Sequence, residues 1–269
     1  MEGTGKLCAA ALVFIALLSL FAPVISSYDP NGIDLDSLRR PPGPEHFLGT
    51  DNKGRDVFTR ILYGGRISLG IAATAAFFSL LIGMILGLCS GYFGGKVDLL
   101  LMAVVDLVLS FPALLLAIGI GILFPSGIHT VVIAIVTVGW ASFARIIRGQ
   151  ILMLREAAFI ESARSVGCSH ARILFRHLLP QCIPVMLVMA GMKIGSFILT
   201  ESSLSFLGLG AQPPTATWGS MISANRVYIA SAPWMVLFPG AMIALTVFCC
   251  NILGDILRDR YGLNIKGRI

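Results

Sequence analysis

Long apolar stretches alternate with short polar segments along this chain of 269 residues. A helix needs roughly 20 apolar residues to cross the hydrocarbon core of a bilayer. The uncharged run between Asp106 and Arg145 is too long for one crossing, and Pro125-Ser126-Gly127 divides it into two. The predicted spans are 7–25, a run within 67–95, 99–123, 128–147, 184–206, and a run that starts near Pro233 and ends before Asp255. The pattern therefore predicts six transmembrane helices.

The first span also has the outline of a cleaved signal peptide, because Lys6 precedes an apolar run. A signal peptide ends in a cleavage site with small residues at fixed positions. No clear small-x-small site follows residue 25. We therefore expect this span to stay attached as a membrane anchor.

Composition supports an all-α integral membrane protein. Charged residues make up 13% of the chain and hydrophobic residues 56%, whereas soluble domains carry about 25% charged residues. The net charge of +6 does not indicate nucleic-acid binding, because the basic residues flank apolar spans. The cysteines lack metal-ligand spacing, so we expect neither a metal site nor a disulfide framework. They are Cys8, Cys89, Cys168, Cys182, Cys249 and Cys250.

The distribution of Lys and Arg predicts the orientation in the membrane. With six spans, both termini lie on the same side as the loop 145–180. That side carries 12 Lys and Arg residues and the opposite side 7. Cytoplasmic loops carry the excess of basic residues. Both termini and the loop 145–180 are therefore predicted to be cytoplasmic.

The segment 161–180, ESARSVGCSHARILFRHLLP, is a charged, helix-forming loop between apolar spans. Its pattern predicts a helix over about 150–166, a turn at Gly167, and a second helix that Ser169 caps and that ends before Pro180. Leu174 and Leu178 lie one turn apart and are predicted to pack inward, while Arg172 and Arg176 form a second one-turn pair. Two interpretations fit: a solvated hairpin that only connects two spans, or a surface that binds a soluble partner.

This loop resembles the EAA motif of ABC-importer permeases. The matching register is Glu161-Ser162-Ala163, then Gly167, then Leu179-Pro180, with Ser162 in place of the first alanine. The literal Glu156-Ala157-Ala158 does not fit, because its glycine would be misplaced. In that family the loop forms a coupling helix that docks into a groove of a cytoplasmic ATPase subunit, so the resemblance assigns an ATPase-coupling role here. The matching residues are Glu161, Ser162, Ala163, Gly167, Arg172, Leu179 and Pro180.

Three further blocks resemble the dipeptide/oligopeptide/nickel branch of these permeases: 46–69 (HFLGTDNKGRDVFTRILYGGRISL), 201–221 (ESSLSFLGLGAQPPTATWGSM) and 251–259 (NILGDILRD). The chain departs from the branch at Ala103, where an arginine is usual. It departs again in the tail 261–269, which lacks the usual Asp-Pro-Arg ending.

The resemblance implies a six-helix type I ABC importer permease fold. It divides the chain into an anchor and external segment (1–66), a permease domain (67–257) that contains the coupling loop 150–180, and a cytoplasmic tail (258–269). It also implies a bacterial or archaeal cytoplasmic membrane and import of di- or oligopeptides, with nickel or a nickel chelate as the alternative solute. The implied partners are a second, similar permease, two cytoplasmic ATPases and an external solute-binding protein. No phosphate-binding loop GxxxxGK[ST] occurs in the sequence, so we expect no cofactor on this chain, with ATP and Mg²⁺ on the ATPase subunits.

Three ionisable residues fall inside predicted spans: Asp106, Lys193 and Glu201. Such groups are unfavourable in a bilayer unless they are paired or face water. We predict that they line or gate the solute path, with Lys193 and Glu201 pointing into one cavity. The alternative is an internal or inter-subunit ion pair that orders the bundle. Gly83 and Gly87, four residues apart, predict a close helix contact.

Two other classes of protein were weighed against an ABC permease. An ion-coupled secondary transporter would also place ionisable residues in its spans, but it has no need of the loop 161–180, and no internal repeat of broken helices is evident. An intramembrane enzyme would need a facing Ser or Asp dyad or a His-Glu-x-x-His motif, and these are missing. The histidines, His46, His129, His170 and His177, are far apart in sequence and suggest no nickel-ligand cluster.

Overall fold

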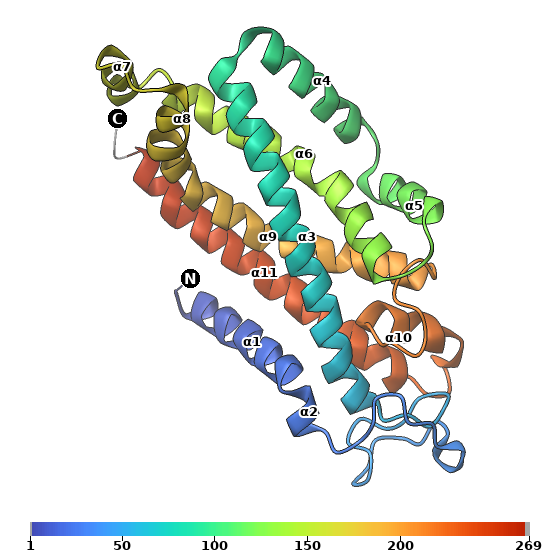
Figure 1. Cartoon of the computed structure of the whole chain (residues 1–269). Coiled ribbons are helices and arrows are strands. Elements are labelled where there is room, and N and C mark those ends of the chain that lie inside the picture. The colour runs from blue at the N-terminus through green and yellow to red at the C-terminus, as the bar shows by residue number, and fades with distance from the viewer. Residues whose placement is uncertain (1, 267–269) are drawn as a thin grey trace.

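The computed structural model describes residues 2–266, which form helices joined by loops with no β-strand among them (Figure 1). The longer helices are α1 (Glu2–Leu20), α3 (Val57–Phe93), α4 (Gly95–Ser110), α5 (Ala113–Leu123), α6 (Ile128–Leu154), α9 (Leu179–Phe206) and α11 (Trp234–Lys266). The shorter ones are α2 (Ala22–Ile25), α7 (Ala158–Ser165), α8 (His170–Arg172) and α10 (Trp218–Asn225). A π-helical turn, Ile173–Leu178, joins α8 to α9. Short 3-10 turns lie at Leu35–Ser37 and Arg226–Tyr228.

Five helices are long and apolar enough to cross a membrane: α1, α3, α6, the continuous helix His170–Phe206 and α11. The predicted third span, 99–123, is not one helix. It consists of α4 and α5, which meet at an angle of 91°. Pro112 has no N–H to donate and forces Phe111 into an extended conformation with ψ 142°, so the helix ends there. Six spans result when this bent pair is counted as one.

Glycines set the contact between α3 and α6. A Cβ atom on Gly87 would lie 2.7 Å from the Ala144 carbonyl oxygen, and one on Gly91 would lie 2.7 Å from Ile151 Cβ. Gly83 faces Phe143 and the Trp140 carbonyl in the same way. The predicted close packing at Gly83 and Gly87 is confirmed, and Gly91 extends it by one turn.

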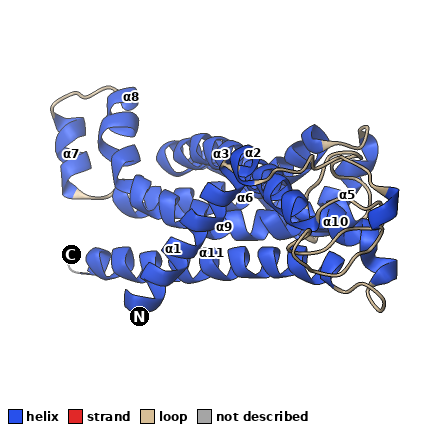
Figure 2. Cartoon of the chain, turned by 90° about the horizontal axis from the view of Figure 1, so that it is seen from below, coloured by secondary structure: helices blue, strands red, loops and turns tan. Residues whose placement is uncertain are grey.

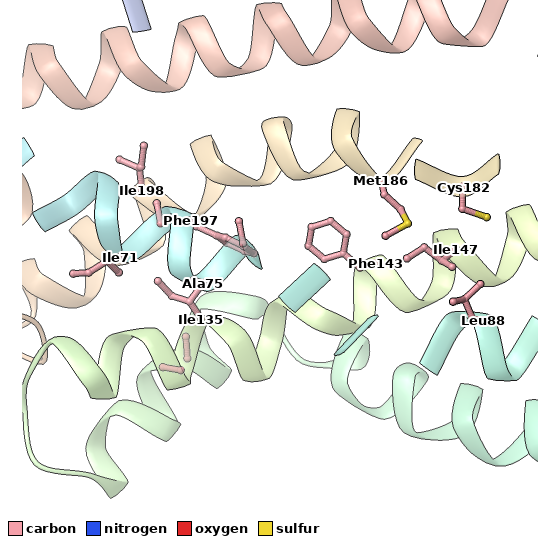
Figure 3. Close-up of a cluster of buried hydrophobic side chains, with 14 of the residues drawn as sticks. Ile71, Ala75, Leu88, Ile135, Phe143, Ile147, Cys182, Met186, Phe197 and Ile198 are labelled. Carbon is pink, nitrogen blue, oxygen red and sulfur yellow. The ribbon is translucent and has the colours of Figure 1, made fainter. Parts of the chain in front are cut away.

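The core lies where α3, α6 and α9 meet (Figure 3). α3 contributes Ile71, Ala75 and Leu88, α6 contributes Ile135, Phe143 and Ile147, and α9 contributes Met186, Phe197 and Ile198. Large apolar side chains also remain exposed on the outer helices, among them Leu99 at 75% and Leu123 at 77%. Soluble monomers rarely expose large contiguous apolar patches, and this exterior suits contact with lipid.

The segment between α2 and α3 folds into a cap at one end of the bundle. Asp51 and Arg55 form a buried ion pair of 2.7 Å, and the Thr50 carbonyl accepts a 3.2 Å hydrogen bond from Trp234 Nε1 of α11. Asp56 caps α3, because its side chain accepts a 2.7 Å hydrogen bond from the Thr59 N–H. The block 46–69 therefore fastens the cap to the helices.

The opposite end of the bundle carries α7, the start of α1 and the end of α11 (Figures 1 and 2). The expected domain boundaries at residues 66 and 258 fall inside α3 and α11, so the chain has no break at either position. The predicted tail 258–269 continues α11 as far as Lys266, and residues 267–269 lie outside the described part of the chain.

Candidate functional site: the 155–180 hairpin and an intramembrane cavity

The helix predicted over 150–166 is two helices, so that prediction is wrong. α6 ends at Leu154 and α7 begins at Ala158, after Ala157 adopts an extended conformation with ψ 144°. Arg155 turns away from the helix, where its Nη1 donates a 3.2 Å hydrogen bond to the Gly91 carbonyl and its Nε pairs with Glu156 at 2.9 Å. This contact ties the end of α6 to α3.

The predicted turn at Gly167 is confirmed. Gly167 has φ +77°, the left-handed conformation that favours glycine. The Gly167 N–H bonds to the Arg164 carbonyl at 2.9 Å, and the Cys168 N–H bonds to the Ala163 carbonyl at 3.0 Å. These two bonds form a Schellman motif, which ends α7 and reverses the chain.

The second arm of the hairpin begins at the predicted cap. The Ser169 side chain accepts a hydrogen bond from the Arg172 N–H at 3.4 Å. The prediction that this helix ends before Pro180 is wrong, because α8, the π-turn and α9 form one continuous helix. The Leu179 N–H bonds to the Leu174 carbonyl, five residues back. A wider turn at this point accommodates Pro180, which has no N–H and would crowd the Arg176 carbonyl in a regular α-helix.

The inward face of the hairpin is apolar. The predicted inward packing of Leu174 and Leu178 is confirmed, and Ile160 and Ile173 join them in the core cluster. Ala163 is also buried, at 7% exposure. The Ala163 side chain therefore packs against its own chain.

The outward face mixes polar side chains with exposed apolar ones, among them Val166 at 80% and Phe175 at 63%. Glu161, Ser162, Gly167, Arg172 and Pro180 are exposed, and Leu179 is half-buried. Ser162 Oγ donates to the Ala158 carbonyl at 2.9 Å within α7. The hairpin lies at the end of the bundle that carries α7 (Figure 2).

A contact that the sequence did not reveal joins the hairpin to α3. Tyr92 Oη lies 2.7 Å from His170 Nδ1, and the Arg164 guanidinium lies 5.8 Å from the centre of the Tyr92 ring. Tyr92 and His170 are 78 residues apart. No local signal in the sequence pairs them.

Asp106 is paired across helices. It forms an ion pair with Arg145 of α6, and both side chains are exposed, at 66% and 50%. Asp106 therefore has a counter-ion on another helix.

Lys193 lines a cavity of about 490 Å³ between α6, α9 and α11. Its ammonium donates a 3.2 Å hydrogen bond to Ser142 Oγ. The cavity wall is largely apolar, and its members are Ile146, Val185, Val188, Met189 and Met192, with Gln150, Ser196, Asn251 and Arg258 as the polar groups beside Lys193.

Glu201 does not line this cavity, so it does not share it with Lys193. Its side chain is fully buried and accepts hydrogen bonds from Ser205 at 2.7 Å and Ser68 at 3.1 Å. Ser68 Oγ also accepts a 3.2 Å hydrogen bond from the Trp218 N–H. Glu201 thus joins α9, α3 and α10.

No group of three or more His, Cys, Asp or Glu side chains in the described part of the chain is placed to hold a metal ion. In this part of the chain the arrangement offers a docking surface and a cavity.

Comparison with known proteins gives the family. The model of the binding-protein-dependent transport system inner membrane component matches residues 79–263. The oligopeptide permease OppC of Bacillus subtilis is 39% identical over 92% of this chain and 81% of its own length. The glutathione permease GsiD of Pectobacterium atrosepticum is 42% identical over 96% of this chain and 87% of its own length. The dipeptide permease DppC of Alkalihalophilus pseudofirmus is 41% identical over 97% of this chain and 87% of its own length.

Solved structures give the fold. A chain of the inward-facing MetNI methionine ABC transporter superposes with a TM-score of 0.61 at 18% identity, over 74% of this chain and 95% of that chain. An amino acid ABC transporter gives a TM-score of 0.57 at 18% identity, over 75% and 94%. The predicted type I importer fold is confirmed. The chain belongs to the inner membrane components of binding-protein-dependent transport systems, and is therefore a multi-pass permease of an ABC importer and not an enzyme.

Proposed function

We propose that this chain is one of two permeases in an importer of di- and oligopeptides. Two cytoplasmic ATPases drive the importer, and an external binding protein delivers the peptide. The permease lies in the cytoplasmic membrane with both termini and the 155–180 hairpin in the cytoplasm. The cap formed by 28–56 then faces outward, toward the binding protein.

The observation that carries this proposal is the continuity of the hairpin with α9. Residues 170–206 form one helix, which begins in the hairpin and continues along the wall of the cavity. A displacement of the hairpin by an ATPase is therefore passed to α9 without an intervening loop. Rigid-body movement of this kind is a common way for an interface to change a distant site.

The docking surface consists of the exposed side chains Glu161, Ser162 and Arg172 and the turn at Gly167. The buried residues Ile160 and Ala163 hold α7 against the bundle from behind. The Tyr92–His170 contact adds a second attachment, to α3. With these attachments the hairpin moves together with α3 and α9 when the ATPase pair closes.

The choice of solute rests on the relatives, which are named for oligopeptides, dipeptides and glutathione. Glutathione is itself a tripeptide, so the three names share a peptide with a free carboxylate. The nickel alternative rests on the sequence resemblance alone. Asp106, Lys193 and Glu201 differ in their surroundings, and only Lys193 lines the cavity.

The test is uptake by proteoliposomes that contain this chain, its partner permease and both ATPases, with the binding protein outside. We expect uptake of a labelled dipeptide that requires ATP and stops when the phosphate-loop lysine of the ATPases is replaced by alanine. Uptake that continues under a proton gradient would favour an ion-coupled transporter. Uptake of nickel without peptide would favour the alternative solute.

Docking is tested by photo-crosslinking. A benzoylphenylalanine introduced in place of Ser162 should crosslink to an ATPase subunit. The same group in place of Asn31, in the cap, should not. Crosslinks from position 162 to the external binding protein would mean that the hairpin lies outside the cell, opposite to the proposed orientation.

A further inference from the structure

Lys193 lies near the middle of α9, a helix long and apolar enough to span a membrane. It is roughly 20 Å along the helix from either end of α9, at 1.5 Å per residue. An ammonium at this depth is strongly unfavourable unless it faces water or an anion. Among the described residues it donates a hydrogen bond to the neutral hydroxyl of Ser142, at 3.2 Å. Within residues 3–260, no Asp or Glu side chain forms an ion pair with it.

The cavity beside Lys193 contains no opposing charge. None of the described residues that line it carries a carboxylate. Its other cation, Arg258, already pairs with Asp255 at 3.2 Å and Asp259 at 3.5 Å. Lys193 therefore gives the cavity a positive charge that its described lining does not balance.

The rest of the cavity suits a small solute with an apolar body. Val185, Val188, Met189 and Met192 form one wall, and methionine adapts to ligands of different shape. The amides of Gln150 and Asn251 add neutral hydrogen-bonding groups. A volume of about 490 Å³ falls within the range of small-molecule sites, roughly 300–1,000 Å³. An extended dipeptide is about 7 Å long, at roughly 3.3–3.6 Å per residue, and fits this space.

We infer that Lys193 binds the carboxylate of the solute as it crosses the membrane, so that this permease selects solutes with a free carboxyl group. The inference rests on the proposed peptide function and assigns the C-terminal carboxylate of the peptide to this ammonium. Side chains of the peptide pack against the methionine and valine wall.

A photolabelling experiment tests the site without altering the protein. The complete transporter is placed in nanodiscs, without nucleotide or binding protein, and labelled with the dipeptide alanyl-benzoylphenylalanine. We expect attachment in the segment 185–196, where Met189 and Met192 line the cavity. An unlabelled dipeptide acid should compete about tenfold or more better than its C-terminal amide, since a hydrogen bond between charged groups is stronger than a neutral one. Label elsewhere, or equal competition by acid and amide, overturns the inference.

Substitutions then test whether the charge of Lys193 binds the carboxylate. Lys193→Met removes the ammonium at similar length, and should weaken binding of the acid about tenfold or more while leaving the amide unchanged. Lys193→Arg keeps the charge and should retain the preference for the acid. The control is Lys96→Met, at an exposed lysine in the first turn of α4, which should bind both peptides as wild type does. If Lys193→Met fails to assemble, the photolabelling result decides.

Failure of the inference is distinguishable from failure of the proposed function. If the wild-type transporter imports dipeptides with ATP and Lys193→Met binds the acid normally, the peptide function stands and the assignment of Lys193 is wrong. An acidic residue of the partner permease would then be the neutralising group. If the wild type imports no peptide at all, the proposed function itself fails.

Discussion

Arg148 of α6 holds the carboxylate of Asp98 of α4 with two hydrogen bonds, Nε to Oδ1 at 2.5 Å and Nη2 to Oδ2 at 2.6 Å. The Ser90 hydroxyl of α3 donates to the same carboxylate. Both charged side chains are largely shielded, at 31% and 19% exposure. Three helices therefore meet at one carboxylate.

Asp98→Asn should destabilise the permease. The change removes the charge from a two-bond pair and leaves the Arg148 guanidinium without its counter-ion, at a cost of about 1–3 kcal/mol. The measurement is thermal unfolding of the purified protein in detergent. Glu156→Gln is the control, because the Arg155–Glu156 pair is exposed on the carboxylate side, at 72%, and a surface pair contributes about 0–1 kcal/mol. Equal losses of stability from the two changes would show that the three-helix contact at Asp98 contributes no more than an exposed ion pair.

Gly167→Val should reduce ATP-driven uptake while the subunit still inserts and assembles. A Cβ at Gly167 would meet no atom within 4 Å, so crowding within this chain is not the reason. The reason is its φ of +77°, which costs a non-glycine residue about 1–2 kcal/mol. Loss of the turn moves the whole docking surface. Gly167→Asn should keep most of the uptake, because asparagine adopts this conformation more readily.

The matched control is Gly149→Ala in α6, where a Cβ also meets nothing within 4 Å and φ is not positive. Uptake and assembly should stay at the wild-type level. Wild-type uptake by Gly167→Val would refute the role of the turn in coupling.

The sequence predicts those features of the hairpin that depend on neighbouring residues. Gly167 and Ser169 carry their turn and cap signals locally, and both predictions agree with the structure. The break at 155–157 contains neither glycine nor proline. At this break the Arg155 side chain bonds to the Gly91 carbonyl, 64 residues away. A local pattern cannot contain that information.

Two prolines have opposite effects on their helices. Pro112 follows an extended residue and breaks the third span. Pro180 follows a π-turn, which supplies a bond pattern that needs no N–H at residue 180, and the helix continues. The residue is the same, and the backbone before it decides the outcome. The family motif does not say which way its side chains point, and the structure turns Ala163 inward.

Gly87→Leu should prevent α3 from packing on α6. A Cβ at this position already lies 2.7 Å from the Ala144 carbonyl and 2.9 Å from Ile147 Cβ, and both neighbours are fixed in a helix. The smaller change Gly87→Ala should cost about 1–3 kcal/mol, as overpacking of a well-packed contact does. Expression level and thermal unfolding in detergent measure the two effects. Gly70→Ala, on the same helix with no atom within 4 Å of the added carbon, should be neutral. A stable Gly87→Leu protein would disprove the close contact.

Glu201→Leu should lower stability without changing peptide affinity. The carboxylate is fully buried and accepts hydrogen bonds from the hydroxyls of Ser205 and Ser68. Leucine leaves both hydroxyls without this acceptor, at a cost of about 1–3 kcal/mol. Glu201→Gln should lose less, because its amide oxygen still accepts one of these bonds.

Stability is measured by thermal unfolding in detergent, and affinity by dipeptide binding to the assembled transporter in nanodiscs. Ser203→Ala is the control, because the exposed Ser203 hydroxyl bonds only within its own helix, to the Leu199 carbonyl at 2.8 Å. The two measurements then distinguish the roles of Lys193 and Glu201. Changes at Lys193 should affect peptide binding, and changes at Glu201 should affect thermal stability. A Glu201→Gln protein with normal stability and weakened peptide binding would return Glu201 to the solute path, and would mean that the path includes the region between α9, α3 and α10 that is closed in this structure.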